Sequence, residues 1–281
     1  MTDGIKLLGL FGHPVHHSLS PAMHNKEFMA LNLPYYYQAF DVAPANLKEA
    51  VAGIRALGIR GVNVTIPHKV DVMQYLDDVD EHAELIGAVN TIVNENGYLT
   101  GYNTDSEGFM DSLKEETAAD IEKSRILVIG AGGAARAVLT GLWSSGASDV
   151  CLTNRSMEKA QHLAGKFEGR LSLKVWSKEE AAAKNNEYDI IINTTSLGMS
   201  PNTKEKPWPT DRIKPACICC DLIYNPLKTE WLHEMEEKGN ETLNGLGMFV
   251  RQGAASFEKW TGSYPDVHRM KETVLQNLGG K

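Results

Sequence analysis

The stretch Arg125-Ile126-Leu127-Val128-Ile129-Gly130-Ala131-Gly132-Gly133-Ala134-Ala135-Arg136-Ala137-Val138 determines the architecture of this chain. Residues 126–129 are four consecutive apolar residues, and they predict a strand buried on both faces of a sheet. The run ends in glycine, and the composition from residue 134 onward is typical of a helix. The spacing of Gly130, Gly132 and Ala135 matches the dinucleotide fingerprint G-x-G-x-x-G/A.

Each small residue of that fingerprint has a physical task in a dinucleotide site. Gly130 makes the tight turn, Gly132 lets the backbone approach a pyrophosphate, and Ala135 allows the helix to pack closely on the strand. A plain glycine turn between a strand and a helix has a similar pattern. Because strand, loop and helix occur here in the required order, we predict dinucleotide binding, with the phosphates at the helix N-terminus. The other loop residues in this predicted site are Ala131, Gly133 and Ala134.

Length and composition limit the classes of protein to which the chain can belong. Its 281 residues suffice for about two domains, and 42% hydrophobic with 23% charged residues is typical of a globular protein. The net charge of −8 argues against a nucleic-acid partner. We see no signal peptide and no apolar run near the ~20 residues that cross a bilayer, so we expect a cytoplasmic protein with no membrane partner.

The four cysteines are Cys151, Cys217, Cys219 and Cys220. Three of them lie in one apolar run that predicts a core strand, and their spacing is not the C-x-x-C pattern of a metal site. We interpret them as buried thiols that behave as small hydrophobic residues. This use of cysteine fits the reducing cytoplasm, and no metal site is predicted.

Strands and helices alternate in the first part of the chain. Helices are expected from Ser20, as the capping residue with Pro21 in the first turn, and from Pro44. Further short helices are expected at 69–76 and 80–86. An Asn96-Gly97 turn joins two strands into a hairpin. The expected strands are 5–11, 35–42, 62–66, 88–93 and 98–102.

The second part alternates in the same way, with strands at 126–129, 150–153, 171–176, 188–194 and 217–222. Helices are expected at 107–117, 229–237, from 247, and at 264–278. The loop 201–209 is either a mobile lid or a passive connection. We therefore predict an α/β fold with two domains, of which the second starts with the strand of the glycine fingerprint.

The residues after the second strand of the nucleotide domain predict which dinucleotide binds. An acid there would bond the 2′-hydroxyl of NAD, whereas an arginine accommodates the 2′-phosphate of NADP. This chain has Asn154, Arg155 and Ser156, with Lys159 one turn later, and no carboxylate. The alternative is that Arg155 only caps the loop. We predict NADP(H), because a guanidinium matches a phosphate in charge and shape.

Polar clusters in the first domain also lie at strand ends, where open α/β sheets bind ligands. Ser18 and Ser20 could hold a carboxylate at a helix N-terminus, although helix capping by Ser20 alone is the simpler interpretation. Lys69 held against Asp105 would be a positioned proton donor for carbonyl reduction, or an acceptor for alcohol oxidation. Either charge alone would more often be a solvated surface group. Neighbouring polar residues in these loops are Asn63, Thr65 and Asn90, and the rival acids are His13, His16, His17 and His68.

Several motifs together resemble the shikimate dehydrogenase family, over essentially the whole chain. In the first domain they are Gly12-His13-Pro14-Val15-His16-His17-Ser18-Leu19-Ser20-Pro21-Ala22-Met23-His24-Asn25, Val62-Asn63-Val64-Thr65-Ile66-Pro67-His68-Lys69, Gly87-Ala88-Val89-Asn90-Thr91 and Tyr102-Asn103-Thr104-Asp105. In the second they are Gly130-Ala131-Gly132-Gly133-Ala134, Asn154-Arg155-Ser156, Asn193-Thr194-Thr195-Ser196-Leu197-Gly198-Met199, Asp221-Leu222-Ile223-Tyr224 and Asn244-Gly245-Leu246-Gly247-Met248.

The resemblance implies reversible NADPH-dependent reduction of 3-dehydroshikimate to shikimate, a step of aromatic amino acid biosynthesis. It implies that Lys69 and Asp105 form the catalytic pair, and that Ser18 and Ser20 bind the substrate carboxylate. Further substrate contacts implied by the family are Thr65, Asn90, Tyr224 and Gln252. Since Gln252 must then return to the first domain, we expect a mostly parallel substrate domain of residues 1–105 and 246–281 and a Rossmann-type NADP domain of residues 106–245. Additional residues implied to lie near the cofactor are Glu81, Leu222 and Gly245. Two mild departures are His13, where Asn or Asp is frequent, and Ser156, which replaces the commoner Thr and keeps its hydroxyl.

Two alternatives remain open at this stage. One is a quinate/shikimate or aminoshikimate dehydrogenase paralogue on the same scaffold. The other is a catalytically silent NADP-binding sensor, against which the presence of both Lys69 and Asp105 argues. The partner expected in every case is a small-molecule substrate, and the chain is expected to be a monomer or a homodimer.

Overall fold

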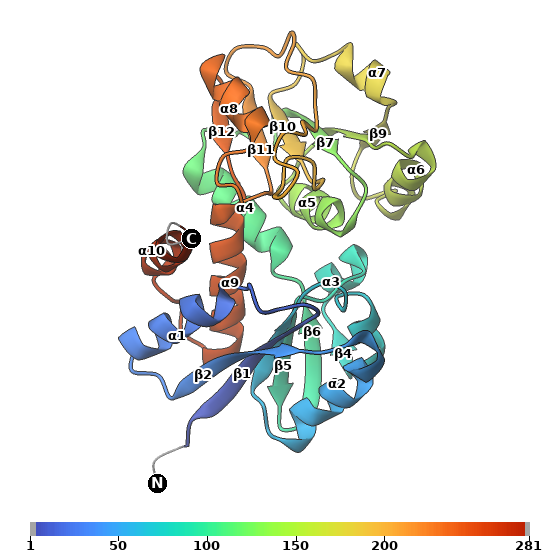
Figure 1. The fold of residues 1–281 in the computed structure, drawn as a ribbon. Coiled ribbons are helices and arrows are strands. Elements are labelled where there is room, and N and C mark those ends of the chain that lie inside the picture. Colours follow the sequence, from blue (N-terminus) through green and yellow to red (C-terminus); the bar gives the residue numbers. More distant parts are fainter. Residues whose placement is uncertain (1–3, 279–281) are drawn as a thin grey trace. The chain divides into compact units, whose positions relative to one another are not determined.

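The computed structural model describes residues 4–278 and divides the chain into two compact units (Figure 1). Unit 1 consists of Met1–Thr104 and Val250–Lys281, and unit 2 consists of Asp105–Phe249. The first boundary coincides with the first residue of α4 (Asp105–Glu116), and the second falls inside α9 (Leu246–Thr261). Unit 1 is therefore built from two separate parts of the sequence.

Unit 1 contains a six-stranded sheet with the order β2-β1-β3-β5-β6-β4. β2, β1 and β3 are parallel, β5 is antiparallel to both β3 and β6, and β4 is parallel to β6. The α/β class with a mixed sheet agrees with the predicted fold. Its strands are β1 (Lys6–Gly12), β2 (Tyr35–Asp41), β3 (Gly61–Val64), β4 (Asp78–Val79), β5 (Thr91–Glu95) and β6 (Tyr98–Tyr102).

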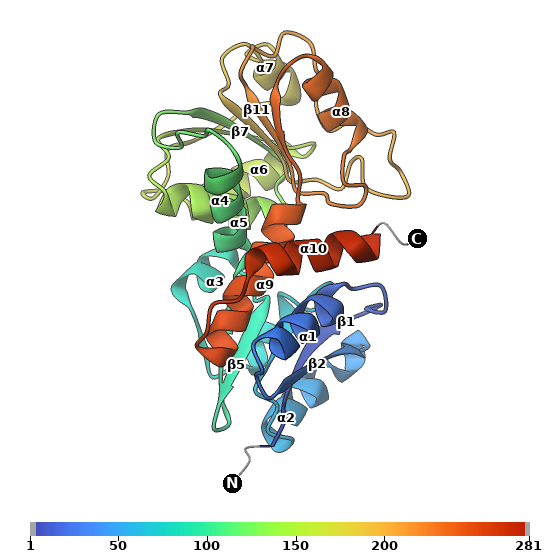
Figure 2. The same ribbon diagram turned by 90° about the vertical axis from the view of Figure 1, so that its left-hand side faces the viewer.

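The sheet of unit 1 is covered on both faces, because apolar side chains point to both faces along its strands and form a hydrophobic cluster on each. In β1, Leu8 and Leu10 face one cluster with Phe28 and Phe257, whereas Phe11 faces the other cluster. The first cluster lies under α1 (Ser20–Ala30) and α9, and α2 (Leu47–Ala56) covers the second. Figure 2, turned from the first view, shows α1, α9 and α10 (Val267–Leu278) together on one side of this sheet.

One local prediction for unit 1 was wrong. Ser20 is not the capping residue of α1, because the helix already begins at Ser20 and Leu19 precedes it without a side-chain cap. The short helix expected at 69–76 is present as a 3₁₀ helix, Asp71–Tyr75. The hairpin prediction is confirmed, since Asn96 and Gly97 have φ of 56° and 92° between β5 and β6. The other helical segments of unit 1 are the 3₁₀ turn Pro44–Asn46 and α3 (Glu81–Ile86).

A buried ion pair joins the two parts of unit 1. Glu27 of α1 is 0% exposed and accepts two hydrogen bonds from the guanidinium of Arg269 on α10, at 2.7 and 2.8 Å. The same carboxylate accepts the backbone N–H of Asp266 at 2.9 Å. Because three donors surround it, the buried charge of Glu27 is compensated, and α10 is held against α1.

Unit 2 contains a second six-stranded sheet, with the order β12-β11-β10-β7-β8-β9, and all its pairs are parallel. This order is that of a Rossmann fold. Its strands are β7 (Arg125–Ile129), β8 (Asp149–Thr153), β9 (Leu173–Val175), β10 (Ile190–Asn193), β11 (Ile218–Asp221) and β12 (Glu241–Leu243). Its helices besides α4 are α5 (Gly133–Ser144), α6 (Met157–Lys166), α7 (Lys178–Ala182) and α8 (Glu230–Glu237).

The core of unit 2 confirms the interpretation of the cysteines, since all four are free and buried. Cys219 packs in one cluster with Trp208 and with Trp231 of α8. Trp208 donates its indole N–H to Asn185 Oδ1 at 2.7 Å. Within residues 4–278, the buried indole nitrogen of Trp231 has no hydrogen-bond partner. The same residues include no helix long and apolar enough to cross a membrane.

The two tryptophans of this cluster allow a matched test of a buried hydrogen bond. Trp208→Phe should lower the free energy of unfolding by about 1–3 kcal/mol more than Trp231→Phe, because it leaves Asn185 Oδ1 unsatisfied. Trp231→Phe removes a similar volume together with an N–H that is already unpartnered. Urea denaturation of both variants measures the difference, and equal losses would contradict this account.

Candidate functional site

The carboxyl edge of the sheet in unit 2 gathers the residues that follow its central strands. The parallel register pairs Ile129 with Thr153 and with Asn193, and it pairs Asn193 with Asp221. The next residue along each strand therefore lies in the same row at this edge. That row comprises Gly130, Asn154, Thr194 and Leu222. The strand order reverses between β7 and β10, which is where open α/β sheets form their ligand crevice.

The glycine loop has the geometry of a phosphate cradle. Gly130 has φ +113°, and a Cβ there would lie 2.5 Å from Thr194 Oγ1, so the turn requires glycine. Gly132 precedes α5, and a Cβ built on it would meet nothing within 4 Å. The open space in front of Gly132 faces the first turn of α5, which has neither a side-chain cap nor an acidic residue. An anionic group fits this helix N-terminus.

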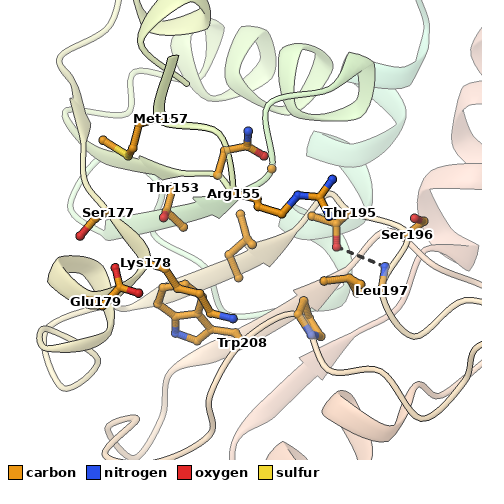
Figure 3. A pocket seen from close by; sticks show the side chains of 14 residues that line it. Thr153, Arg155, Met157, Ser177, Lys178, Glu179, Thr195, Ser196, Leu197 and Trp208 are labelled. Atoms are coloured by element: carbon orange, nitrogen blue, oxygen red, sulfur yellow. Dashed lines mark hydrogen bonds between the residues drawn. The ribbon is translucent and has the colours of Figure 1, made fainter. Parts of the chain in front are cut away.

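A cavity of about 530 Å³ adjoins this edge (Figure 3). Its wall includes Gly130 from the glycine loop and Asn154 and Arg155 from the end of β8. Figure 3 shows Arg155, Lys178 and Thr195 around the same hollow. The sequence did not assign the other lining residues to the site. Three of them lie beside the predicted ones, namely Ile129, Thr153 and Met157. The rest come from three further loops and are Ser177, Lys178 and Glu179 at the start of α7, Thr195, Ser196 and Leu197 after β10, and Pro207 and Trp208.

Arg155 is exposed in the wall of this cavity, and among residues 4–278 its side chain has neither a hydrogen bond nor an ion pair. It therefore does not cap the loop. Asn154 instead donates to Ser156 O at 3.0 Å, and Ser156 Oγ caps α6 by accepting the N–H of Lys159 at 3.3 Å. The structure thus brings Asn154 and Arg155 to the cavity, whereas the hydroxyl of Ser156 starts the following helix.

The predicted residues Leu222 and Gly245 lie against each other in unit 2. Gly245 N–H donates to Ile223 O at 2.9 Å, and a Cβ on Gly245 would lie 2.0 Å from Leu222 O. This approach admits only glycine. Tyr224, two residues after Leu222, stacks on Phe249 with ring centroids 4.7 Å apart, and burial raises its pKa.

Arg136 in the first turn of α5 is a further cation that sequence reasoning did not assign. Its guanidinium Nη2 would lie 3.9 Å from a Cβ on Gly133, beside the glycine loop. Partial burial lowers its pKa, and no hydrogen bond or ion pair within residues 4–278 engages its guanidinium. The signal was present in the sequence, since an arginine three residues into the helix points back toward the loop.

A buried carboxylate links two loops at this edge. Asp221 Oδ1 accepts from Asn193 Nδ2 and from the Ile223 N–H, both at 3.1 Å, and Oδ2 accepts the Thr229 hydroxyl at 2.9 Å. Asn193 Oδ1 in turn accepts the N–H and hydroxyl of Thr195. Asp221 therefore orients the Thr195 wall of the cavity. Burial raises the pKa of Asp221 to about 6, despite three donors that lower it.

The sheet of unit 1 has a comparable polar edge. Phe11 pairs with Val64, Asn63 with Thr91, and Thr91 with Tyr102, so the segments after β1, β3 and β6 and before β5 lie together. The predicted substrate residues at this edge are Ser18, Ser20, Thr65 and Asn90. Ser18 Oγ accepts the Ser20 N–H at 3.2 Å, and Thr65 N–H donates to Phe11 O at 2.9 Å.

The remaining predicted residues are distributed over both units. Lys69 follows β3 in unit 1, where its carbonyl accepts the Val89 N–H at 2.7 Å. Gln252 lies on the part of α9 that belongs to unit 1, and Glu81 is the first residue of α3. Asp105 is the first residue of both α4 and unit 2.

The histidines proposed as rival acids are engaged elsewhere. Buried His68 donates Nε2–H to Val42 O at 2.7 Å. His13 and His16 both bond the Asp41 carboxylate, at 2.7 and 3.1 Å. These three histidines therefore have the hydrogen-bond partners of structural residues. His17 is exposed in the same loop.

A second hollow, of about 1020 Å³, lies at the opposite edge of the sheet in unit 1. Its wall is basic, but Arg60 bonds Trp260 O and Asn94 O, and Arg55 bonds Gly97 O and Asp77. These guanidinium groups therefore stabilise the hairpin and α9, and their hydrogen bonds are already made within the protein.

Across residues 4–278, no group of three or more His, Cys, Asp or Glu side chains is placed to hold a metal ion.

Comparison with known families matches three segments of the chain. Residues 10–92 match the "Shikimate dehydrogenase substrate binding domain", and 112–206 match "Shikimate / quinate 5-dehydrogenase". Residues 245–275 match the "Shikimate 5'-dehydrogenase C-terminal domain". The three segments together span both units.

Individual relatives cover nearly the whole chain. A shikimate dehydrogenase (NADP(+)) of Geobacillus sp. (strain WCH70) is 54% identical over 275 residues, which are 98% of this chain and 99% of the relative. The Thermus thermophilus shikimate 5-dehydrogenase, solved with NADP(H) and shikimate, has a TM-score of 0.88 and 36% identity over 97% of this chain and 99% of its own. A quinate dehydrogenase of Corynebacterium glutamicum, solved with NAD, has a TM-score of 0.90 and 31% identity over 98% and 100%.

The raised pKa of Asp221 predicts a specific pH dependence of stability. Its folded pKa of about 6 lies above the value of about 3.9 expected in the unfolded chain. Between those values the folded state binds a proton that the unfolded state does not, so the free energy of unfolding falls as pH rises through this window. Asp221→Asn should remove that contribution, on the order of 3 kcal/mol.

Urea denaturation at several pH values between about 4 and 7 measures this effect. The wild-type protein should lose stability relative to Asp221→Asn as the pH rises. Asp211→Asn, which changes an exposed carboxylate of the same unit, is the matched control and should follow the wild type. Parallel profiles for the wild type and Asp221→Asn would show that Asp221 ionises without penalty.

Proposed function

The chain belongs to the shikimate dehydrogenase family, and we propose from this premise that it catalyses the reversible NADPH-dependent reduction of 3-dehydroshikimate to shikimate. The chain is an oxidoreductase of this family, and NADP(H) is its cofactor. The observation that carries the proposal is the exposed Arg155 at the end of β8, where an NAD-specific site would carry an acid. In the cell the reaction would serve aromatic amino acid biosynthesis.

The cofactor fits the residues at the carboxyl edge of unit 2. The glycine loop leaves open space before α5 for a pyrophosphate, with Arg136 beside it, and Arg155 supplies a guanidinium for a 2′-phosphate. When bound, NADPH supplies the hydride that reduces the substrate carbonyl. Other residues proposed for cofactor binding are Ala131, Gly133, Ala134, Asn154, Ser156, Lys159, Leu222, Gly245 and Glu81.

The substrate is a small anionic polyol, and the residues proposed to bind it are mostly hydroxyls and amides. Ser18 and Ser20 are proposed to hold its carboxylate near the start of α1. Thr65 and Asn90 lie on the same polar edge of unit 1 and are proposed to bond ring hydroxyls. Tyr224 and Gln252 are the remaining proposed contacts. A site of hydroxyls and amides suits such a ligand because each donor or acceptor can form a hydrogen bond with one polar group of the ligand.

Lys69 and Asp105 are proposed as the catalytic pair. During reduction the ammonium of Lys69 donates a proton to the oxygen that forms at C3 of the substrate, and in the reverse direction the neutral amine accepts it. The Asp105 carboxylate orients that ammonium and accepts a substrate hydroxyl. The positive charge of Lys69 stabilises the developing alkoxide, so this step requires no metal.

The nearest alternative is a dehydrogenase of the same family that also uses quinate or an amino-substituted substrate. The NAD-bound quinate dehydrogenase shares the fold at 31% identity, so fold alone does not separate the two activities. Arg155 and the pair Ser18 and Ser20 favour the biosynthetic enzyme. A silent NADP-binding sensor is disfavoured because both Lys69 and Asp105 are present.

A kinetic comparison of two substrates with two cofactors tests the proposed activity. The wild-type enzyme should oxidise shikimate with NADP⁺ in preference to quinate and to NAD⁺. Arg155→Ala should raise the KM for NADP⁺ by about 10- to 100-fold, the value of lost charge-assisted hydrogen bonds, and leave that for NAD⁺ unchanged. Lys166→Ala, an exposed change at the end of α6, is the control. A preference for NAD⁺ or quinate would reject the assignment, and intact NADP⁺ binding without turnover would indicate the sensor.

The role of Lys69 can be tested separately from binding. Lys69→Ala should lower kcat by roughly 10² or more, the lower end of general acid–base contributions, with a smaller effect on the KM for shikimate. Lys48→Ala, which removes an exposed lysine of α2, should change neither constant. Steady-state kinetics of both variants measure this, and an unchanged kcat would remove Lys69 from the mechanism.

A further inference from the structure

A buried group of amides and hydroxyls lies beneath the polar edge of unit 1, and we call it the polar cluster. It joins β3, the start of β5, the end of β6 and α9. Its members are buried and hydrogen-bonded to one another. They are Asn63, Asn90, Thr91, Thr104 and Ser256.

The orientation of the Asn63 amide is determined by groups whose role is not ambiguous. Its Nδ2 lies 3.1 Å from the carbonyl oxygen of Asn90, which can only accept. Its Oδ1 lies 2.8 Å from the hydroxyl of buried Tyr37, which donates to it. The second N–H of Asn63 is then directed at Thr91 Oγ1 and Ser256 Oγ, at 3.1 and 3.0 Å.

The Asn90 amide is oriented in the same way. Its Oδ1 lies 2.9 Å from the Thr104 N–H, which can only donate, and it also accepts the Thr91 hydroxyl at 2.9 Å. Its Nδ2 donates to Thr104 Oγ1 at 3.0 Å. A rotation of this amide by 180° would place two donors against each other at Thr104. The cluster therefore fixes which end of Asn90 carries the oxygen.

Ser256 is the residue through which α9 enters the cluster. Its Oγ lies 2.7 Å from Thr91 Oγ1, 3.2 Å from Thr104 Oγ1 and 2.9 Å from Gln252 O. Because Thr91 donates its one hydroxyl proton to Asn90 Oδ1, the Ser256 hydroxyl is the donor in the 2.7 Å contact with Thr91. Thr104 Oγ1 donates to Gln252 O at 3.0 Å. Thr104 thus holds the turn of α9 that carries Gln252, and Ser256 connects that turn to the strand end that carries Asn90.

We propose that Ser256 is a positioning residue for substrate binding: together with Thr91 and Thr104 it holds the Asn90 amide and the Gln252 turn in place relative to each other. The inference rests on the proposed function, which assigns Asn90 and Gln252 to the substrate. Ser256 itself is 0% exposed and acts through these neighbours. The ligand recognised here is the hydroxylated ring of the substrate. An amide held in one orientation presents a donor and an acceptor at fixed places, and so selects the ring hydroxyls that can pair with them.

The test compares variants that remove or keep single hydroxyls of the cluster. Ser256→Ala and Thr91→Val should each raise the KM for shikimate about tenfold, with kcat less affected. A tenfold change corresponds to the net free energy of roughly one hydrogen bond. The KM for NADP⁺ should not change. Thr91→Ser keeps the hydroxyl and should remain within about twofold of wild type, so rescue separates the hydrogen bond from the methyl group.

A matched control is available on α10 of the same unit. Thr273 is buried, and its hydroxyl donates to Arg269 O at 2.7 Å, four residues back, which is the spacing between Ser256 and Gln252. Thr273→Val should therefore leave the KM for shikimate unchanged. The double variant Ser256→Ala/Thr91→Val should lose far less than the roughly hundredfold product of the single effects, because both act on one amide.

The outcomes separate this inference from the assigned activity. If the wild type does not oxidise shikimate with NADP⁺, the proposed function fails. If it does, but Ser256→Ala and Thr91→Val match Thr273→Val, Ser256 has no positioning role. Should Ser256→Ala not fold, the pair Thr91→Val and Thr91→Ser still decides the question, since equal KM values for the two would overturn the proposal. Calorimetric binding of shikimate without cofactor gives the same comparison without turnover.

Discussion

The in-register parallel pairing around β7 is the constraint on which the cofactor site of unit 2 depends. β8 and β10 flank β7 with Ile129 opposite both Thr153 and Asn193, so the glycine turn, the β8 end and the β10 end meet in one row. A shift of one residue in either pair would reverse which side chains face the core. A shift in the β7–β8 pair would also move Arg155 away from the glycine loop. The buried Asp221 reinforces this register from the β11 side, because it bonds Asn193 and the backbone of Ile223.

The alternation of elements in the sequence predicted most of the fold. The long apolar runs and the Asn96-Gly97 turn are strong local signals, and the strands and hairpin that they indicate are present. Short elements such as β4 and β12 were missed, since two or three residues show no periodicity. The start of α1 was misplaced for a local reason. Ser20 is a good capping residue, but its N–H bonds the Ser18 hydroxyl and the helix already begins at Ser20, one residue earlier than predicted.

The cofactor-site residues that could be predicted are those close in sequence to a recognisable motif. Asn154 and Arg155 could be found because they follow a strand at a defined distance from the glycine loop. Lys178 lies in no quoted motif, and the motif that contains Thr195 does not show that this residue faces the cofactor, so only the tertiary fold brings both to the cavity. The hydroxyl of Ser256 is a further case. One small residue in an apolar helix gives no sign that it meets Thr91 and Thr104 from distant parts of the chain.

The discontinuity of unit 1 has a consequence for how the chain matures on the ribosome. Phe257 and Trp260 of α9 complete the aromatic cluster around His24, Phe28 and Tyr37, and Arg269 neutralises Glu27. During synthesis the first 104 residues emerge long before these partners. One face of the nascent sheet is then covered by α1 alone, with the Glu27 carboxylate still lacking Arg269, until almost the whole polypeptide has been made. Unit 2 is one continuous segment of the chain, so all of its residues have been synthesised before unit 1 is complete. Unit 2 can therefore fold before unit 1, although it is synthesised after most of unit 1.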